Sequence, residues 1–161
     1  MAKDRKNTEK DIAKKIKLEP PTYFLLYLLL GLVLHFVVPV KKLIIFPYTL
    51  IGVLLIVVGI WLNVWADSLF KRANTTVKPS EKSSTLVLEG PYRLSRHPMY
   101  LGMVIALLGV AIMLGSLVSF LGTIVCFITL QAIFIPHEER AMEETFGEAY
   151  TEYKKRVRSW I

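Results

Sequence analysis

Four long apolar runs, separated by short polar stretches, dominate the chain. They cover approximately residues 22–40, 43–66, 99–114 and 117–135. A helix needs about 20 mainly apolar residues to cross the hydrocarbon core of a bilayer. The second and fourth runs satisfy this length easily, and the first is adequate. The third run is short, so its helix is expected to be tilted or to begin before Met99. The pattern predicts an all-α integral membrane protein with about four transmembrane helices and a cytoplasmic amphipathic C-terminal helix.

Composition agrees with this pattern and indicates what the charges face. Hydrophobic residues make up 53% of the 161 residues, and the formal net charge is +7. The charged residues cluster between the apolar runs, which is how a bilayer sorts a sequence. A basic surplus can indicate nucleic-acid binding, but here Lys and Arg flank apolar runs. The expected partner is therefore the anionic headgroup layer of a lipid bilayer, not nucleic acid.

The distribution of Lys and Arg predicts an orientation. Of these 20 residues, 18 lie before residue 22, between residues 67 and 98, or after residue 135, and the other two are Lys41 and Lys42 in the first loop. The positive-inside rule then places both termini and residues 67–98 in the cytoplasm. The short chain favours a prokaryotic inner membrane, with an internal eukaryotic membrane as the alternative.

The chain divides into a short N-terminal segment and one membrane domain. Residues 1–21 predict a basic segment lying on the membrane surface. They do not predict a cleavable signal peptide, because the basic stretch is long and no small-x-small cleavage site follows the first run. Residues 22–161 form the membrane domain, with a cytoplasmic tail at 136–161, where Pro136 is expected to open a new helix.

Most of the small and polar residues inside the apolar runs are interpreted as packing residues. Glycines recur seven residues apart, which places them on one helix face and lets neighbouring helices approach closely. Cys126 lacks metal-ligand companions and is interpreted as a small buried hydrophobe, so no metal site is expected. Asn63 either faces a pocket or bonds to a neighbouring helix, and the sequence favours neither. The glycine pairs are Gly52 and Gly59, Gly102 and Gly109, and Gly115 and Gly122.

Two segments hold most of the chemistry. Residues 86–102 contain Gly-Pro-Tyr-Arg and Arg-His-Pro, and residues 138–153 contain Glu-Glu and Phe-Gly-x-x-Tyr-x-x-Tyr. Taken singly, these residues could snorkel, cap helices or form a packing stripe. If the last two spans form a hairpin, both segments meet at one membrane face. That mixture of charges and aromatic residues suits a zwitterionic cytosolic ligand meeting a lipid-borne one.

These residues carry a family resemblance. The pattern Leu-Val-x-x-Gly-Pro-Tyr-Arg-x-x-Arg-His-Pro-x-Tyr-x-Gly, followed by Glu-Glu and Phe-Gly-x-x-Tyr-x-x-Tyr, resembles the isoprenylcysteine carboxyl methyltransferases. They belong to a wider group that includes the membrane phospholipid methyltransferases. The resemblance covers about residues 61–161. One departure is Ser84, where many members have His, and the chain has fewer N-terminal spans than the eukaryotic enzymes.

The resemblance implies an enzyme that uses S-adenosylmethionine without a soluble dinucleotide-type domain, in agreement with the absence of Gly-x-Gly-x-x-Gly from the sequence. Arg96 and Glu139 are its candidate catalytic residues. By the same resemblance, the cofactor contacts would come from Leu86, Val87, Gly90, Tyr92, Arg96, His97, Tyr100, Glu138, Glu139, Tyr150 and Tyr153.

The methyl acceptor is expected to be lipophilic, either an isoprenylcysteine-type carboxylate or a phospholipid-type amine. A carboxylate needs no general base, whereas an amine must lose a proton, for which Glu138, Glu139 and His97 are candidates. Two alternatives stay open. A membrane reductase of the sterol reductase type would bind NADPH, and a non-catalytic scaffold would tolerate replacement of Arg96, His97 and Glu139.

Overall fold

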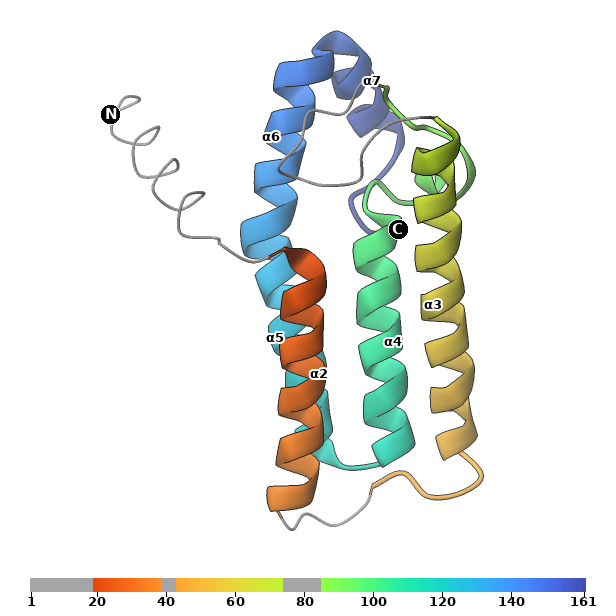
Figure 1. The fold of residues 1–161 in the computed structure, drawn as a ribbon, viewed down its shortest axis with the longest axis vertical. Helices are drawn as coiled ribbons and strands as arrows, with labels where there is room; N and C mark the ends of the chain where they lie inside the picture. Colours follow the sequence, from red (N-terminus) through yellow and green to blue (C-terminus); the bar gives the residue numbers. More distant parts are fainter. Residues whose placement is uncertain (1–18, 39–42, 74–84) are drawn as a thin grey trace, which may run out of the picture.

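The protein is a bundle of long helices whose one end carries two shorter helical segments (Figure 1). The computed structural model describes residues 19–38, 43–73 and 85–161. Within these ranges the chain forms no strand, and the all-α fold class is confirmed. The elements are α2 Pro20–Val37, α3 Thr49–Arg72, η1 Gly90–Arg93, α4 Pro98–Leu114, η2 Leu117–Ser119, α5 Phe120–Thr129, η3 Leu130–Phe134, α6 Ile135–Phe146 and α7 Glu148–Arg156.

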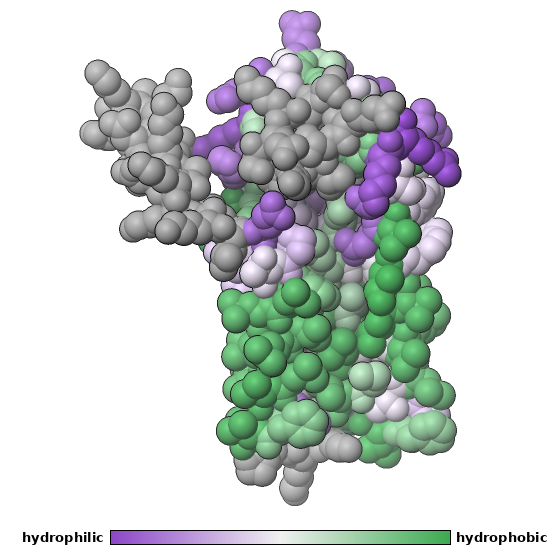
Figure 2. Space-filling view, viewed as in Figure 1, coloured by the Kyte–Doolittle hydropathy of each residue, from purple (hydrophilic) through white to green (hydrophobic). Residues whose placement is uncertain are grey.

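Three of the helical rods are long and apolar enough to cross a membrane: α2, α3 and the continuous rod Leu117–Phe146. Helix α4 is apolar but has 17 residues, a rise of about 25 Å, slightly less than the hydrocarbon core. On the face shown in Figure 2, apolar residues form a band over the lower part of the molecule and hydrophilic residues gather at its upper end. The chain is therefore an integral membrane protein. The predicted surface segment 1–21 lies almost wholly outside the described residues.

Helices α3 and α4 pack backbone to backbone through the predicted glycines. A Cβ added at Gly59 would lie 2.6 Å from the carbonyl oxygen of Gly102, and one at Gly109 would lie 2.6 Å from that of Gly52. No side chain fits at such distances, so the small residues set the separation of the helices. The predicted role of the spacing is confirmed for the pairs Gly52 and Gly59 and Gly102 and Gly109, and the close contact fixes the start of α4 against the middle of α3. It is wrong for the third pair, because Gly115 ends α4 with φ 71° whereas Gly122 lies in α5, so the two do not share a helix face.

The fourth apolar run does not end at Pro136 but continues through it. A proline inside an α-helix lacks a backbone donor and its ring clashes with the carbonyl four residues earlier. Here the wider π-helical turn η3 directly precedes α6 and accommodates the ring. The expected new helix is thus an extension of the membrane rod, which carries Glu138 and Glu139 to the hydrophilic end.

At that end the chain reverses at Gly147 and lays α7 over the bundle (Figure 1). Gly147 has φ 55° and ψ −123°, a conformation that is essentially restricted to glycine. The reversal buries Tyr150 and Tyr153. Tyr153 donates a hydrogen bond of 2.6 Å to the carbonyl of Tyr92, so α7 is joined to the segment that leads into α4.

Candidate functional site

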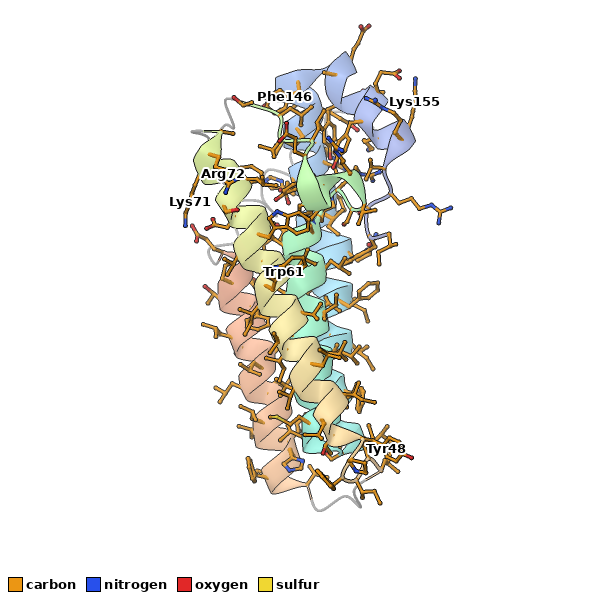
Figure 3. All side chains as sticks on the ribbon, turned by 90° about the vertical axis from the view of Figure 1, so that its right-hand side faces the viewer. Tyr48, Trp61, Lys71, Arg72, Phe146 and Lys155 are labelled. Atoms are coloured by element: carbon orange, nitrogen blue, oxygen red, sulfur yellow. The ribbon has the colours of Figure 1, made fainter. Side chains whose placement is uncertain are left out.

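A cavity opens at the hydrophilic end of the bundle, where six parts of the chain meet. It is bordered by the first residues of α2, the last turns of α3, the segment before α4, the first turns of α4 itself, α6 and α7. Figure 3 shows the region from the side, with Lys71 and Arg72 at the end of α3 and Phe146 at the end of α6. The charged residues of its described lining are Glu19, Asp67, Arg96, His97 and Glu138.

Nine of the eleven predicted cofactor contacts border this cavity. The other two, Gly90 and Glu139, do not line it. Gly90 has φ 58°, and a Cβ there would lie 2.9 Å from Leu69 Cδ1, so this glycine turns the chain tightly against α3. The nine are Leu86, Val87, Tyr92, Arg96, His97, Tyr100, Glu138, Tyr150 and Tyr153.

His97 sits between two carboxylates at the start of α4. Its Nδ1 lies 3.5 Å from Glu138 Oε2, and its Nε2 lies 3.2 Å from Glu139 Oε1. Burial lowers the pKa of His97, but the hydrogen bonds to Glu138 and Glu139 outweigh it, and the net pKa is raised. The raised pKa favours the charged imidazolium, whose Nε2–H would donate to Glu139, while Nδ1 faces Glu138 at the longer distance. The ring also stacks on Tyr100, at 5.6 Å between centroids and 8° between planes.

Arg96 is occupied mainly by the protein itself. Its Nε and Nη2 donate to Glu139 Oε1 at 3.0 and 2.5 Å. Its Nη1 donates to the carbonyls of Val157 at 2.6 Å and of Lys154 at 3.4 Å. Only 11% of the Arg96 side chain is exposed. Such a buried, multiply bonded guanidinium fixes its neighbours in place.

Glu139 is the node of this network. One of its oxygens accepts from Arg96 and faces His97, and the other lies 3.0 Å from Lys154 Nζ. Glu138, one residue earlier, turns toward the cavity with 23% of its side chain exposed. Successive residues on a helix point about 100° apart, since a turn has 3.6 residues. The adjacent carboxylates therefore face different surroundings.

Three of the residues that line the cavity are the buried tyrosines Tyr92, Tyr150 and Tyr153. Burial raises the pKa of Tyr153 to about 12, and it raises the pKa values of Tyr92 and Tyr150 as well, with Glu138 or Glu139 adding to the rise. All three phenols are thus neutral at physiological pH and can donate hydrogen bonds. Their rings give the cavity polarizable, aromatic walls.

Several lining residues were not predicted from the sequence. Asp67 and Phe70 come from α3, and Glu19 precedes α2. The sequence held one signal for these residues: Asp67 is an acidic residue at the end of an apolar run. Its position also suits a simple ion pair with Lys71 one helical turn later, and the structure shows that pair at 2.5 Å. Asn63 donates to Gly59 O of its own helix at 2.9 Å, and its amide packs against Gly102 of α4. It does not border the cavity, and its hydrogen bond stays within α3 instead of reaching a neighbouring helix. Ser84 lies outside the described residues.

The fold and the cavity define the class first: a multi-helix membrane protein with a charged and aromatic site at its hydrophilic end. Comparison with known proteins then gives the family. The sequence model described as phospholipid methyltransferase matches residues 47–149. Because the match covers more than half of the chain, the protein belongs to this family.

Two relatives extend the comparison. Protein-S-isoprenylcysteine O-methyltransferase B of Arabidopsis thaliana is 31% identical over 81 residues, which are 50% of this chain and 41% of the relative. A solved structure of the eukaryotic intramembrane Ras methyltransferase, an isoprenylcysteine carboxyl methyltransferase, matches with a TM-score of 0.66 at 24% identity. It aligns with 88% of this chain and 51% of its own. The resemblance drawn from the sequence is confirmed, and the chain spans about half the length of these relatives or less.

Proposed function

We propose that the protein is an S-adenosylmethionine-dependent membrane methyltransferase that acts on a lipophilic acceptor. The observation that carries this proposal is the position of Glu138, His97 and the buried tyrosines around one cavity. The lining of this cavity combines charged residues with apolar residues of the membrane helices, such as Met103 of α4, and Figure 2 shows apolar and hydrophilic parts of the surface adjoining each other. A reaction between a polar methyl donor and a lipid-borne acceptor requires such a boundary.

The residues that border the cavity fit the donor's chemistry. S-adenosylmethionine carries a sulfonium, an ammonium and a carboxylate. Glu138 can offset the positive charges, and aromatic faces such as those of Tyr92 and Tyr100 attract cations. The imidazolium of His97 offers positive charge to a carboxylate. The bound cofactor would supply an activated methyl group, and the protein's main contribution would be to position the acceptor and exclude water.

The geometry divides the roles of the two carboxylates. Glu139 is bonded to Arg96, His97 and Lys154 and does not line the cavity, so we assign it to positioning. Glu138 borders the cavity and, for an amine acceptor, is the better placed group to receive the proton. His97 is a poor base, because its pKa is raised and its ring nitrogens already face carboxylates.

The acceptor's apolar tail would reach the cavity from the bilayer between α2 and α3. Both helices pack on α4, and both contribute lining residues, among them Pro21 and Phe70, with Met103 of α4 below them. On the outer face of α3, Trp61 is 58% and Trp65 is 37% exposed. The acceptor is an isoprenylcysteine-type carboxylate or a phospholipid-type amine.

The proposed function also implies an orientation of the protein in the membrane. The cavity end would face the cytoplasm, where S-adenosylmethionine is made, with both termini on that side. The excess of Lys and Arg in the segments at this end supports that direction. A prokaryotic inner membrane is the proposed location.

Calorimetric binding of S-adenosylhomocysteine to the detergent-solubilised protein tests the proposal, with NADPH as the control ligand. Saturable binding of S-adenosylhomocysteine alone is expected. Binding of NADPH alone by folded protein would favour a reductase, and binding of neither would favour a scaffold. Transfer of labelled methyl from the cofactor to carboxylate or amine lipids in vesicles would then identify the acceptor.

A further inference from the structure

The five residues after α7, residues 157–161, lie against the segment that enters α4; we call them the C-terminal strap. In Figure 1 the chain descends from α7 to the start of α4. Three successive strap carbonyls accept hydrogen bonds from the adjacent residues Ser95 and Arg96. Val157 O accepts from Arg96 Nη1 at 2.6 Å, Arg158 O from the Arg96 backbone N–H at 2.9 Å, and Ser159 O from Ser95 Oγ at 3.0 Å.

The strap is fastened at its other end by Trp160. The indole Nε1 donates to Gln131 Oε1 at 2.5 Å, and the Trp160 ring lies 4.8 Å from that of Phe127. Gln131 belongs to the π-helical turn of the membrane rod. An amide inside an apolar span gains little from water, so an internal partner matters there more than at a solvated surface.

We propose that Trp160 and Gln131 are positioning residues: together they pin the strap, whose carbonyls hold Arg96 in the orientation that organises Glu139 and His97. The inference rests on the proposed function. A released strap would leave Arg96 with unpaired buried donors, and the guanidinium could then turn away from Glu139. The membrane rod would thus hold the strap through the hydrogen bond between Trp160 and Gln131 and the ring contact between Trp160 and Phe127.

Two variants break the link without removing any residue of the site. Trp160→Phe keeps an aromatic ring but lacks the donor, and Gln131→Leu replaces the acceptor with an apolar side chain that suits a membrane span. The matched control is Thr145→Val, which removes the 2.7 Å hydrogen bond to Ala141 O on the exposed surface of α6. The double variant Trp160→Phe/Gln131→Leu tests whether the two residues act as a pair.

Hydrogen–deuterium exchange of the ligand-free protein is measured first, because it does not depend on the proposed function. The backbone N–H of Arg96 is expected to exchange about fivefold faster in either variant, while the control matches the wild type. S-adenosylhomocysteine affinity is expected to fall by about fivefold in each variant, with no further loss in the double variant and at most a slight fall in the thermal midpoint.

Unchanged exchange at Arg96 would overturn the inference, whatever the protein binds. Faster exchange with unchanged S-adenosylhomocysteine affinity would overturn the link to the site and leave a local anchor. If the wild-type protein does not bind S-adenosylhomocysteine, the proposed function fails, and exchange alone decides whether the strap holds Arg96. Additive losses in the double variant would overturn the pairing of Trp160 with Gln131.

Discussion

Two polar clusters lie at opposite ends of the same apolar bundle, and they differ in whether a polar group borders a cavity. The far cluster consists of His35, Ser116 and Ser119, near the end that carries Tyr48 in Figure 3. His35 Nδ1 lies 2.9 Å from Ser116 Oγ, which lies 2.7 Å from Ser119 Oγ. The site cluster consists of Arg96, His97, Glu138 and Glu139. The far cluster forms a short chain of paired groups, whereas the site cluster presents Glu138 to a cavity.

The difference separates a polar contact that stabilises the fold from one that can bind a ligand. In the far cluster both serines are buried and each has a partner, and the bond from His35 ties α2 to the turn after α4. In the site cluster Glu139 contacts Arg96, His97 and Lys154. These contacts hold Arg96 and His97 in place, and both of these residues border the cavity. Burial alone does not distinguish the clusters, but accessible charge does.

Replacing Arg96 should have the largest effect. In Arg96→Ala, Glu139 Oε1 loses the guanidinium that donates to it twice, and the strap carbonyl of Val157 loses its donor. Removing one member of a buried ion pair costs about 3 kcal/mol or more, so a clear fall in the thermal midpoint is expected. S-adenosylhomocysteine affinity should fall by more than about tenfold, since about 1.4 kcal/mol corresponds to a factor of ten. Thermal unfolding and calorimetry measure both effects, and wild-type stability would contradict the assigned network.

Replacing Glu138 should separate binding from stability. Glu138→Gln removes the charge that faces the cavity. A hydrogen bond to a charged group contributes about 2 kcal/mol. The affinity for S-adenosylhomocysteine should therefore fall by at least about tenfold. Its thermal midpoint should change little, because the side chain is partly exposed. Glu139→Gln is the matched variant and should lower the midpoint more. Equal stability effects in the two variants would contradict the division of roles.

The response to pH should reflect His97. Its folded pKa is raised above the ordinary value of 6.5, so the protonated ring stabilises the folded state. This contribution is fully present below pH 6.5 and is lost as the pH rises through the raised pKa. Thermal midpoints measured from pH 6 to pH 9 should therefore decline, and His97→Gln should flatten the decline. If the wild-type midpoint rose over this range while that of His97→Gln did not, the assigned direction of the His97 pKa shift would be wrong.

Much of the fold could be predicted from the sequence, because length and periodicity report directly on membrane helices. The spacing of Gly52 and Gly59 indicated a close helix face, and the structure shows the contact with α4. The passage through Pro136 could not be predicted, since it depends on the π-helical turn that precedes it. That turn also lets one rod carry both membrane residues and site residues.

The site was predictable where residues follow one another in a motif and not where distant elements supply them. Arg96, His97 and Glu138 were found because the motif names them. The different surroundings of Glu138 and Glu139 depend on how α6 is rotated against α4, which spacing alone does not define. Asp67 and Glu19 reach the cavity through tertiary packing, and Trp160 reaches Gln131 only because the chain folds back after α7.

The smallest effect is expected in the far cluster. His35→Leu removes the bond to Ser116, but the Ser116 hydroxyl still pairs with Ser119, so no buried group is left without a partner. A neutral hydrogen bond contributes about 1 kcal/mol, and the leucine suits the apolar surroundings, so the thermal midpoint should fall slightly at most. S-adenosylhomocysteine affinity should match that of the wild type, because the cluster lies at the opposite end of the bundle from the cavity. A loss of affinity with an unchanged midpoint would mean that the two ends are coupled through α2, whose first residues border the cavity.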